Sequence, residues 1–166
     1  MPAYLLDTNV VSELRRVRAH PAVVAWLRTI PDADLHLSAV TIGELQAGVE
    51  ITREQDPAKA AEIEIWIDRV AETYNVIPMD ARAFRAWARL LHRRSNDLLE
   101  DAMIAATAQV HHLTVVTRNI RDFADLGVET FKSVFWRSDR MNARPEPCGF
   151  NTTAAGRAHA RRGRRG

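Results

Sequence analysis

The chain has 166 residues, of which 46% are hydrophobic and 27% charged, and its formal net charge is +2. This length suits one domain with a sizeable core, and the apolar runs are far shorter than the roughly 20 residues of a membrane-spanning helix. The lone Cys148 excludes a disulfide framework and a thiolate metal site, and the N-terminus lacks a signal-peptide pattern, so we expect a cytoplasmic location.

Positive charge is concentrated near the C-terminus. Residues 138–166 contain seven Arg and two acidic residues, a net charge of +5, which leaves −3 for residues 1–137. Residues 141–166 are rich in Ala, Arg, Gly, Pro and Thr and lack periodicity, which is typical of disorder. We therefore predict a folded domain over residues 1–137 and a basic, disordered tail over residues 138–166.

Short apolar runs alternate with helical patterns along the predicted domain. A strand at 3–6 precedes helices at 10–16 and 21–28, and a strand at 35–37 precedes helices at 40–51 and 57–74. A strand at 76–78 precedes helices at 80–93 and 99–111, and a strand at 114–116 precedes a loop and a weaker strand at 128–131. Strands that alternate with helices predict an α/β fold: a three-layer α/β/α sandwich around a mainly parallel sheet of four or five strands.

Local signals support several of these helices. Thr8 or Asn9 can cap the first helix, and Ser38 can cap the helix at 40–51. In the helix at 80–93, four residues share one face and are expected to pack together: Phe84, Trp87, Ala88 and Leu91.

Four acidic residues lie at the edges of the predicted elements. Asp7 follows the first strand, Asp122 lies in the loop after the fourth strand, and Glu44 and Asp101 lie early in two helices. In parallel sheets, ligands bind outside the carboxyl ends of the strands, where these side chains can converge. Two carboxylates about 4 Å apart repel by about 1 kcal/mol in water and by more in a dry crevice. The pattern therefore suggests a site for Mg²⁺ or Mn²⁺, which prefer oxygen ligands.

Asp7 and Glu44 also have ordinary structural explanations. Asp7 can be a helix cap, although Thr8 and Asn9 are available for that role. A lone Glu usually faces solvent, but Glu44 lies at the edge of a buried stripe, on the side shared by Thr41.

Asp101 is favoured at a helix start by the helix macrodipole, and Asp97 and Glu100 compete with it for a functional role. We rank Asp101 first because it shares a helix face with the small residues Ala105 and Ala108. For the pair Asn119 and Asp122 the ordinary explanation is an Asx turn, and the functional one is an outer role at the metal.

Four short motifs together resemble the PIN-domain ribonucleases, specifically the VapC-type toxins of bacterial toxin–antitoxin pairs. The motifs are Leu6-Asp7-Thr8-Asn9 with Ser12, Leu37-Ser38-x-x-Thr41-x-x-Glu44-Leu45-x-x-Gly48, Asp101-x-x-Ile104-Ala105-Ala106-Thr107-Ala108 and Thr117-Arg118-Asn119-x-x-Asp122-Phe123. They occur in the family's order over residues 5–123. The Asp-Thr-Asn-Val start followed by Ser-Glu is also similar to the FitB branch of the family.

The resemblance implies cleavage of RNA phosphodiester bonds with Mg²⁺ or Mn²⁺. It implies that Asp7, Glu44 and Asp101 are catalytic metal ligands and that Asp122 is a fourth such acid. Polar support is implied for a second group of side chains: Thr8, Asn9, Ser12, Thr117 and Asn119. The arginines at the end of the first helix are candidates for contacts with RNA phosphates or with acidic residues of an antitoxin: Arg15, Arg16 and Arg18.

The resemblance also implies partners. It implies a small antitoxin protein whose tail occupies the groove, and a toxin–antitoxin hetero-oligomer that binds operator DNA through the antitoxin. Such toxins usually form homodimers. The basic tail after Arg137 departs from the family pattern, which normally stops near the last strand.

Two other functions remain open from the sequence alone. A phosphatase of the haloacid-dehalogenase type also has an Asp after its first strand, but it needs a second Asp two residues later, where this chain has Asn9. A PIN-like module that binds RNA or protein without cleavage is the other alternative, although all four acids are present.

Overall fold

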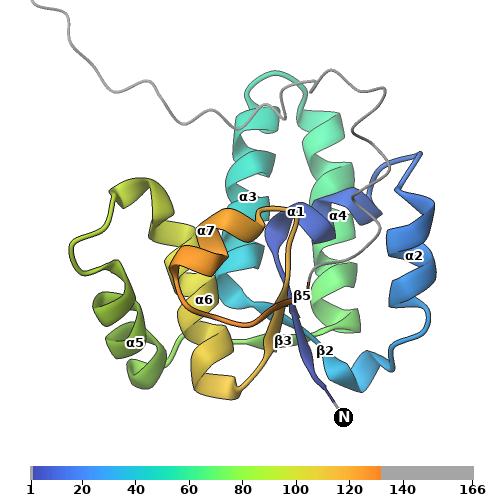
Figure 1. Cartoon of the computed structure of the whole chain (residues 1–166). Helices are drawn as coiled ribbons and strands as arrows, with labels where there is room; N and C mark the ends of the chain where they lie inside the picture. The colour runs from blue at the N-terminus through green and yellow to red at the C-terminus, as the bar shows by residue number, and fades with distance from the viewer. Residues whose placement is uncertain (1, 132–166) are drawn as a thin grey trace, which may run out of the picture.

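The computed structural model describes residues 2–131, which form a five-stranded sheet with helices on both faces (Figure 1). The strands are β1 (Tyr4–Leu6), β2 (Leu35–Ser38), β3 (Asn75–Ile77), β4 (Thr114–Val116) and β5 (Thr130–Phe131). They lie in the order β3-β2-β1-β4-β5, and every pair is parallel. The predicted three-layer fold is confirmed, with the weak fifth strand included. The predicted tail and residues 132–137 lie outside the described residues.

Seven helices cover the sheet within the described part of the chain. They are α1 (Thr8–Leu14), α2 (Pro21–Leu27), α3 (Ala39–Arg53), α4 (Pro57–Thr73), α5 (Ala81–Leu91), α6 (Leu99–His111) and α7 (Ile120–Asp125). Two 3-10 turns, Asp32–Asp34 and Asn96–Leu98, precede β2 and α6. Six of the helices match the predicted ones, whereas α7 occupies a segment predicted to be a loop. Among residues 2–131, no helix has the length and apolar character needed to cross a membrane.

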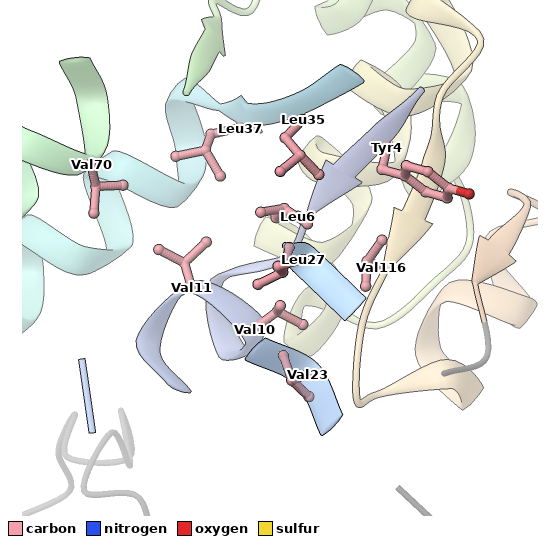
Figure 2. Close-up of a cluster of buried hydrophobic side chains, with 10 residues drawn as sticks. All are labelled: Tyr4, Leu6, Val10, Val11, Val23, Leu27, Leu35, Leu37, Val70 and Val116. Carbon is pink, nitrogen blue, oxygen red and sulfur yellow. The ribbon is translucent and has the colours of Figure 1, made fainter. Parts of the chain in front are cut away.

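Alternation along the central strand divides the core into two layers. Tyr4 and Leu6 face the cluster that α1, α2, α3 and α4 help to form, and Figure 2 shows its buried side chains. Leu5 faces the opposite way, into the cluster formed with α5, α6 and α7. Successive strand residues point to opposite faces, so a three-residue strand is enough to bury apolar surface in both layers.

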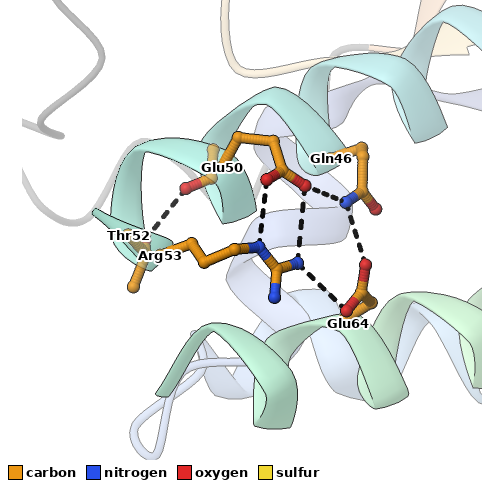
Figure 3. Close-up of polar contacts among 6 residues, drawn as sticks. Gln46, Glu50, Thr52, Arg53 and Glu64 are labelled. Atoms are coloured by element: carbon orange, nitrogen blue, oxygen red, sulfur yellow. Dashed lines mark hydrogen bonds and ion pairs between the residues drawn. The ribbon is translucent and has the colours of Figure 1, made fainter. Parts of the chain in front are cut away.

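Helix α3 is fixed against α4 by apolar and polar contacts. Val49, Ala60 and Ile67 form a small buried cluster between the two helices. On the surface above it, the Arg53 guanidinium bridges Glu50 on its own helix and Glu64 on α4, at 3.0 Å from each (Figure 3). Exposed ion pairs stabilise little, so the buried cluster contributes most of the stability of this contact. This packing positions the helix that carries Glu44.

The predicted packing face of α5 is wrong in part. Phe84 is 46% exposed and Ala88 is exposed, whereas the buried residues of this helix are Ala83 and Ala86. Small side chains let α5 approach α6 closely, since α6 also presents alanines to that layer. Phe84 is left at the rim, with its ring edge against Trp87 at a centroid distance of 6.2 Å.

Candidate functional site

Asp7 lies at the carboxyl end of the central strand and is 4% exposed. Its N–H donates a 3.0 Å hydrogen bond to the carbonyl oxygen of Val116, which joins the ends of β1 and β4. Its Oδ2 accepts hydrogen bonds from the Thr117 hydroxyl at 2.6 Å and from Nδ2 of Asn9 at 2.5 Å. Two chain segments that are distant in sequence therefore hold one carboxylate.

Asp7 is also the N-cap of α1, because its Oδ1 accepts a 2.7 Å hydrogen bond from the Thr8 N–H. The expectation that Thr8 or Asn9 caps this helix and leaves Asp7 uncommitted is wrong. The helix starts two residues earlier than predicted, so Thr8 and Asn9 lie inside it and their side chains make other contacts. Oδ1 of Asp7 therefore caps the helix, while Oδ2 accepts the hydrogen bonds from Thr117 and Asn9.

Glu44 is joined to the first helix. The Thr8 hydroxyl donates a 2.5 Å hydrogen bond to Oε2 of Glu44, which connects α1 to α3. Ser38 caps α3 as predicted, through a 3.2 Å hydrogen bond from the Val40 N–H. Thr41, on the same side of α3 as Glu44, is fully buried. Glu44 is itself half-buried, and it faces the first helix rather than open solvent.

Asp101 lies in the first turn of α6, and the small residues that share its face, Ala105 and Ala108, are fully buried. Within residues 2–131 its half-buried carboxylate accepts no hydrogen bond. The competitors Asp97 and Glu100 are both exposed. A carboxylate that is turned inward without a protein donor is available to a ligand.

Burial and neighbouring charge raise the pKa values of two of these carboxyl groups. Loss of hydration is the largest effect on Glu44, and the hydrogen bond from Thr8 opposes it. Together with the negative charges of Asp7, Asp101 and Glu100, loss of hydration raises the pKa of Glu44 to about 7. Loss of hydration, as the largest effect, and the negative charges of Asp7, Asp122 and Glu100 together raise the pKa of Asp101 to about 6. The four predicted acids, Asp7, Glu44, Asp101 and Asp122, are therefore near enough to interact, and we call them the acidic cluster.

Burial and hydrogen bonding have opposite effects on the pKa of Asp7. Burial raises the pKa of its carboxyl group, while the hydrogen bonds from Thr117, Thr8 and Asn9 lower it. Burial is the largest of these effects, so the pKa of Asp7 remains above its ordinary value. Hydrogen bonds to the charged form keep the carboxylate oriented even though its environment disfavours the charge.

Asp122 is tied to Asn119 in the first turn of α7, where Nδ2 of Asn119 donates a hydrogen bond to Oδ2 of Asp122. The Asn119 N–H donates a 2.9 Å hydrogen bond to the Thr117 hydroxyl, which itself contacts Asp7. Both residues were predicted to lie in a loop, and they lie instead at the start of a short helix that packs through Phe123, a fully buried side chain.

Ser12 and the arginines that follow α1 are not brought to the acidic cluster by any hydrogen bond in the described residues. Ser12 lies within α1, and its hydroxyl makes no hydrogen bond in residues 2–131. Arg15, Arg16 and Arg18 are exposed and lie beyond the end of the helix at Leu14.

Two further acids lie near the acidic cluster: Glu13, which was not predicted from the sequence, and Glu100, which was ranked below Asp101. Glu13 is 5% exposed and takes part in ion pairs with Arg16 and Arg118. Its position in an otherwise apolar stretch of α1 was the available signal. Glu100, which we ranked below Asp101, is exposed but contributes to the raised pKa values of Glu44 and Asp101.

The donor set of the acidic cluster fits a hard divalent cation. Its groups are carboxylates that lose hydration and repel one another, and a bound cation would remove both costs. Within residues 2–131, no three His, Cys, Asp or Glu side chains form a ready-made metal cage. Mg²⁺ does not require one, since it usually keeps several waters and binds through one or two carboxylates.

Comparison with known proteins gives a family and several similar structures. A family model described as PIN domain matches residues 4–129. The toxin FitB of Neisseria gonorrhoeae is 31% identical over 137 residues, covering 76% of this chain and 95% of that protein. The VapC ribonuclease Y4jK of Sinorhizobium fredii is 33% identical over 135 residues, covering 75% and 93%.

Solved structures agree with the sequence comparison. The crystal structure of FitAcB from Neisseria gonorrhoeae superposes with a TM-score of 0.69 at 30% identity, covering 80% of this chain and 98% of that one. FitAB bound to an IR36 DNA fragment gives a TM-score of 0.67 at 30% identity, covering 77% and 93%. The residues matched by the family model, 4–129, include every member of the acidic cluster.

Proposed function

The chain belongs to the PIN-domain family, and from this premise we propose that it is the toxin of a toxin–antitoxin pair and acts as a divalent-metal-dependent ribonuclease. The observation that carries the proposal is the acidic cluster at the carboxyl edge of the sheet. Three of its carboxyl groups have raised pKa values because they are buried together. Relatives named as a toxin and as a VapC ribonuclease support the reaction class.

The residues that would hold Mg²⁺ or Mn²⁺ are Asp7, Glu44, Asp101 and Asp122. When bound, the ion would supply an activated water and would stabilise the charge that develops on a phosphodiester. Asp101 is suited to a direct ligand role because its carboxylate accepts no hydrogen bond within residues 2–131. Asp122 shares its Oδ2 with the Asn119 amide, which suits an outer position.

Polar neighbours would orient these acids. Thr117 and Asn9 hold one oxygen of Asp7, and Thr8 holds one oxygen of Glu44. Each hydrogen bond favours the charged form of its partner carboxylate and fixes its direction, which is how outer residues tune a metal site. We include Thr8, Asn9, Thr117 and Asn119 in this supporting role. Ser12, which has no such contact in residues 2–131, stays a weaker member of the set.

The proposed partners are RNA as substrate and a cognate antitoxin, with operator DNA bound through the antitoxin. Structures titled FitAcB and FitAB bound to DNA, at 30% identity, support a two-protein assembly. A homodimer and a location in the cytoplasm, where RNA and operator DNA are accessible, are parts of the same proposal. So is the division into a nuclease domain at residues 1–137 and a basic tail at residues 138–166.

The test is RNA cleavage by the purified chain with Mg²⁺ or Mn²⁺, compared with Asp7→Asn and Asp101→Asn prepared in parallel. We expect cleavage by the wild type, none with EDTA, and loss of activity in both variants. Equal cleavage by all three proteins would reveal a contaminating nuclease. Binding of RNA with no cleavage by the wild type would favour the non-cleaving module.

A further inference from the structure

Glu13 is a buried carboxylate outside the acidic cluster. Only 6% of its side chain is exposed, and it lies on α1 four residues after Asn9. Its Oε1 accepts a 3.0 Å hydrogen bond from the His20 N–H. Its Oε2 lies 3.2 Å from Nη1 of Arg16 and 3.5 Å from Nη1 of Arg118. Burial of a carboxylate is costly without partners, so these contacts are what keep Glu13 inside the domain.

Both guanidinium groups beside Glu13 also reach solvent. The side chain of Arg16 is 49% exposed and that of Arg118 is 41% exposed. The formal charges of Glu13, Arg16 and Arg118 sum to +1. Because a guanidinium has five N–H donors in a planar fork, it can contact a carboxylate on one side and a phosphate on another.

Hydrogen bonds through the side chain of Asn9 place this group next to the acidic cluster. The Arg118 N–H donates a 3.1 Å hydrogen bond to Oδ1 of Asn9, and Nδ2 of Asn9 donates to Oδ2 of Asp7. Glu13 is six residues after Asp7, about 9 Å along the axis of α1 at 1.5 Å per residue. At a rise of about 3.4 Å per stacked nucleotide, this distance corresponds to two or three nucleotides of a strand.

We infer that Glu13 positions Arg16 and Arg118 as a binding site for a backbone phosphate near the cleaved bond, an inference that rests on the proposed ribonuclease function. The acidic cluster repels a phosphodiester strand, so a strand that enters it needs fixed positive charge nearby. An exposed arginine loses side-chain entropy when it is immobilised by a ligand. Glu13 reduces that loss by holding both guanidinium groups in place before RNA arrives.

The direction in which one substitution changes the affinity for RNA distinguishes positioning by Glu13 from a simple effect of net charge. Glu13→Gln removes a negative charge and keeps the shape of the side chain. If charge alone mattered, this variant would bind RNA more tightly than the wild type. If Glu13 positions the two arginines, binding weakens several-fold despite the more favourable net charge.

Arg118→Met tests the phosphate contact directly. The probe is a fluorescently labelled, random-sequence, single-stranded RNA pool, and anisotropy is measured with EDTA present so that no cleavage occurs. We expect Kd to rise by about tenfold and the slope of log Kd against log salt to fall by about 0.7, as for one lost phosphate contact on a single strand. Arg118→Lys, which keeps the charge and loses the fork, should give an intermediate Kd.

The matched control is Arg69→Met, the same change of charge at an exposed position of α4. This position lies near the end of α4 that leads into β3, at the edge of the sheet opposite the acidic cluster. Its Kd should stay within twofold of the wild-type value. Thermal melting of every variant shows which ones are folded at the assay temperature, and Arg16→Met replaces Arg118→Met if the latter is unfolded.

Cleavage kinetics with Mg²⁺ give a second readout. Loss of a contact to a remote phosphate raises KM and leaves kcat within about twofold. Tighter RNA binding by Glu13→Gln, or a Kd for folded Arg118→Met equal to that of Arg69→Met, would overturn the inference while leaving the ribonuclease function intact. A wild-type protein with no affinity for the pool would contradict both.

Discussion

The Thr117 hydroxyl donates a 2.6 Å hydrogen bond to Oδ2 of Asp7, although the two residues are 110 positions apart in the chain. Both side chains are buried, and they follow the adjacent parallel strands β4 and β1. The pairing of these strands therefore determines the orientation of the carboxylate that we place at the centre of the metal site.

Thr117→Val tests this relationship with a side chain of nearly the same shape. The hydroxyl also accepts hydrogen bonds from Asn9 and Asn119, so its loss leaves buried polar groups unpaired and should cost about 1–3 kcal/mol of unfolding free energy. Cleavage should fall about 10- to 100-fold, as is typical when the partner of a metal ligand is lost. Thr114→Val, at the other end of β4, is the control for urea denaturation and activity, and equal losses in both variants would contradict the assigned role.

Asp101→Asn should stabilise the protein while it removes activity. Burial and neighbouring charge raise the pKa of Asp101 from 3.8 to about 6, so its charge destabilises the folded state at pH 7. After allowance for solvent screening, a neutral isostere should add about 1 kcal/mol in the absence of metal.

Asp68→Asn, at an exposed position of α4, makes the same chemical change away from the acidic cluster and should change stability by less than about 0.5 kcal/mol. Both variants can be compared by urea denaturation in EDTA. A clear loss of stability in Asp101→Asn would mean that the carboxylate is held by favourable contacts rather than by repelling neighbours.

Stability without metal should fall as the pH rises from about 4.5 to about 7. The pKa of Glu44 rises from 4.5 to about 7 on folding and that of Asp101 from 3.8 to about 6, so the folded state binds more protons across this range. By linkage, the unfolding free energy then decreases with increasing pH. Three exposed carboxyl groups have lowered pKa values, those of Glu50, Glu64 and Asp80. They make stability rise with pH, but only at pH values below their ordinary pKa values of 3.8 to 4.5.

Urea denaturation in EDTA at several pH values measures this slope. The double variant Glu44→Gln/Asp101→Asn is the control, because it removes both groups, and its stability should vary less between pH 4.5 and 7. A wild-type protein whose stability rises over the same range would show that these carboxyl groups are not close together in solution.

Deletion of residues 138–166 should leave the thermal midpoint unchanged, since all three hydrophobic clusters are formed within residues 2–131. The control is a chain that ends at Gly127 and lacks β5. It loses Phe131, whose ring stacks on Trp26 at 4.9 Å and meets Tyr4 edge-on at 5.7 Å. Melting followed by circular dichroism should show a lower midpoint for the control alone. A large shift on removal of the tail would contradict the proposed domain boundary.

Elements with a clear hydrophobic period could be predicted from the sequence. The helix at 99–111 was predicted with the bounds that α6 has, and each strand was placed within two residues. The convergence of Asp7, Glu44 and Asp101 followed from the rule that parallel strands present their carboxyl ends at one edge.

Contacts that depend on tertiary structure could not be predicted. Local capping preferences allow Asp7, Thr8 or Asn9 as the N-cap of α1. The contacts that give Thr8 and Asp7 their other roles come from residues distant in the chain, the carboxylate of Glu44 and the hydroxyl of Thr117. Helix α7 is too short to show a period, so its burial of Phe123 became evident only in the folded sheet. The ion pair of Glu13 with Arg118 likewise joins segments whose proximity no local pattern encodes.

Calorimetric titration of Mn²⁺ into the apo-protein at pH 7.5 tests whether the acidic cluster is one divalent-cation site. It needs no knowledge of the RNA target. We predict saturable binding by the wild type, the same binding by Asp68→Asn, and at least a tenfold loss of affinity in Asp101→Asn, about 1.4 kcal/mol. No saturable binding by the wild type, or equal affinity in Asp101→Asn, would show that the acidic cluster is not a divalent-cation site.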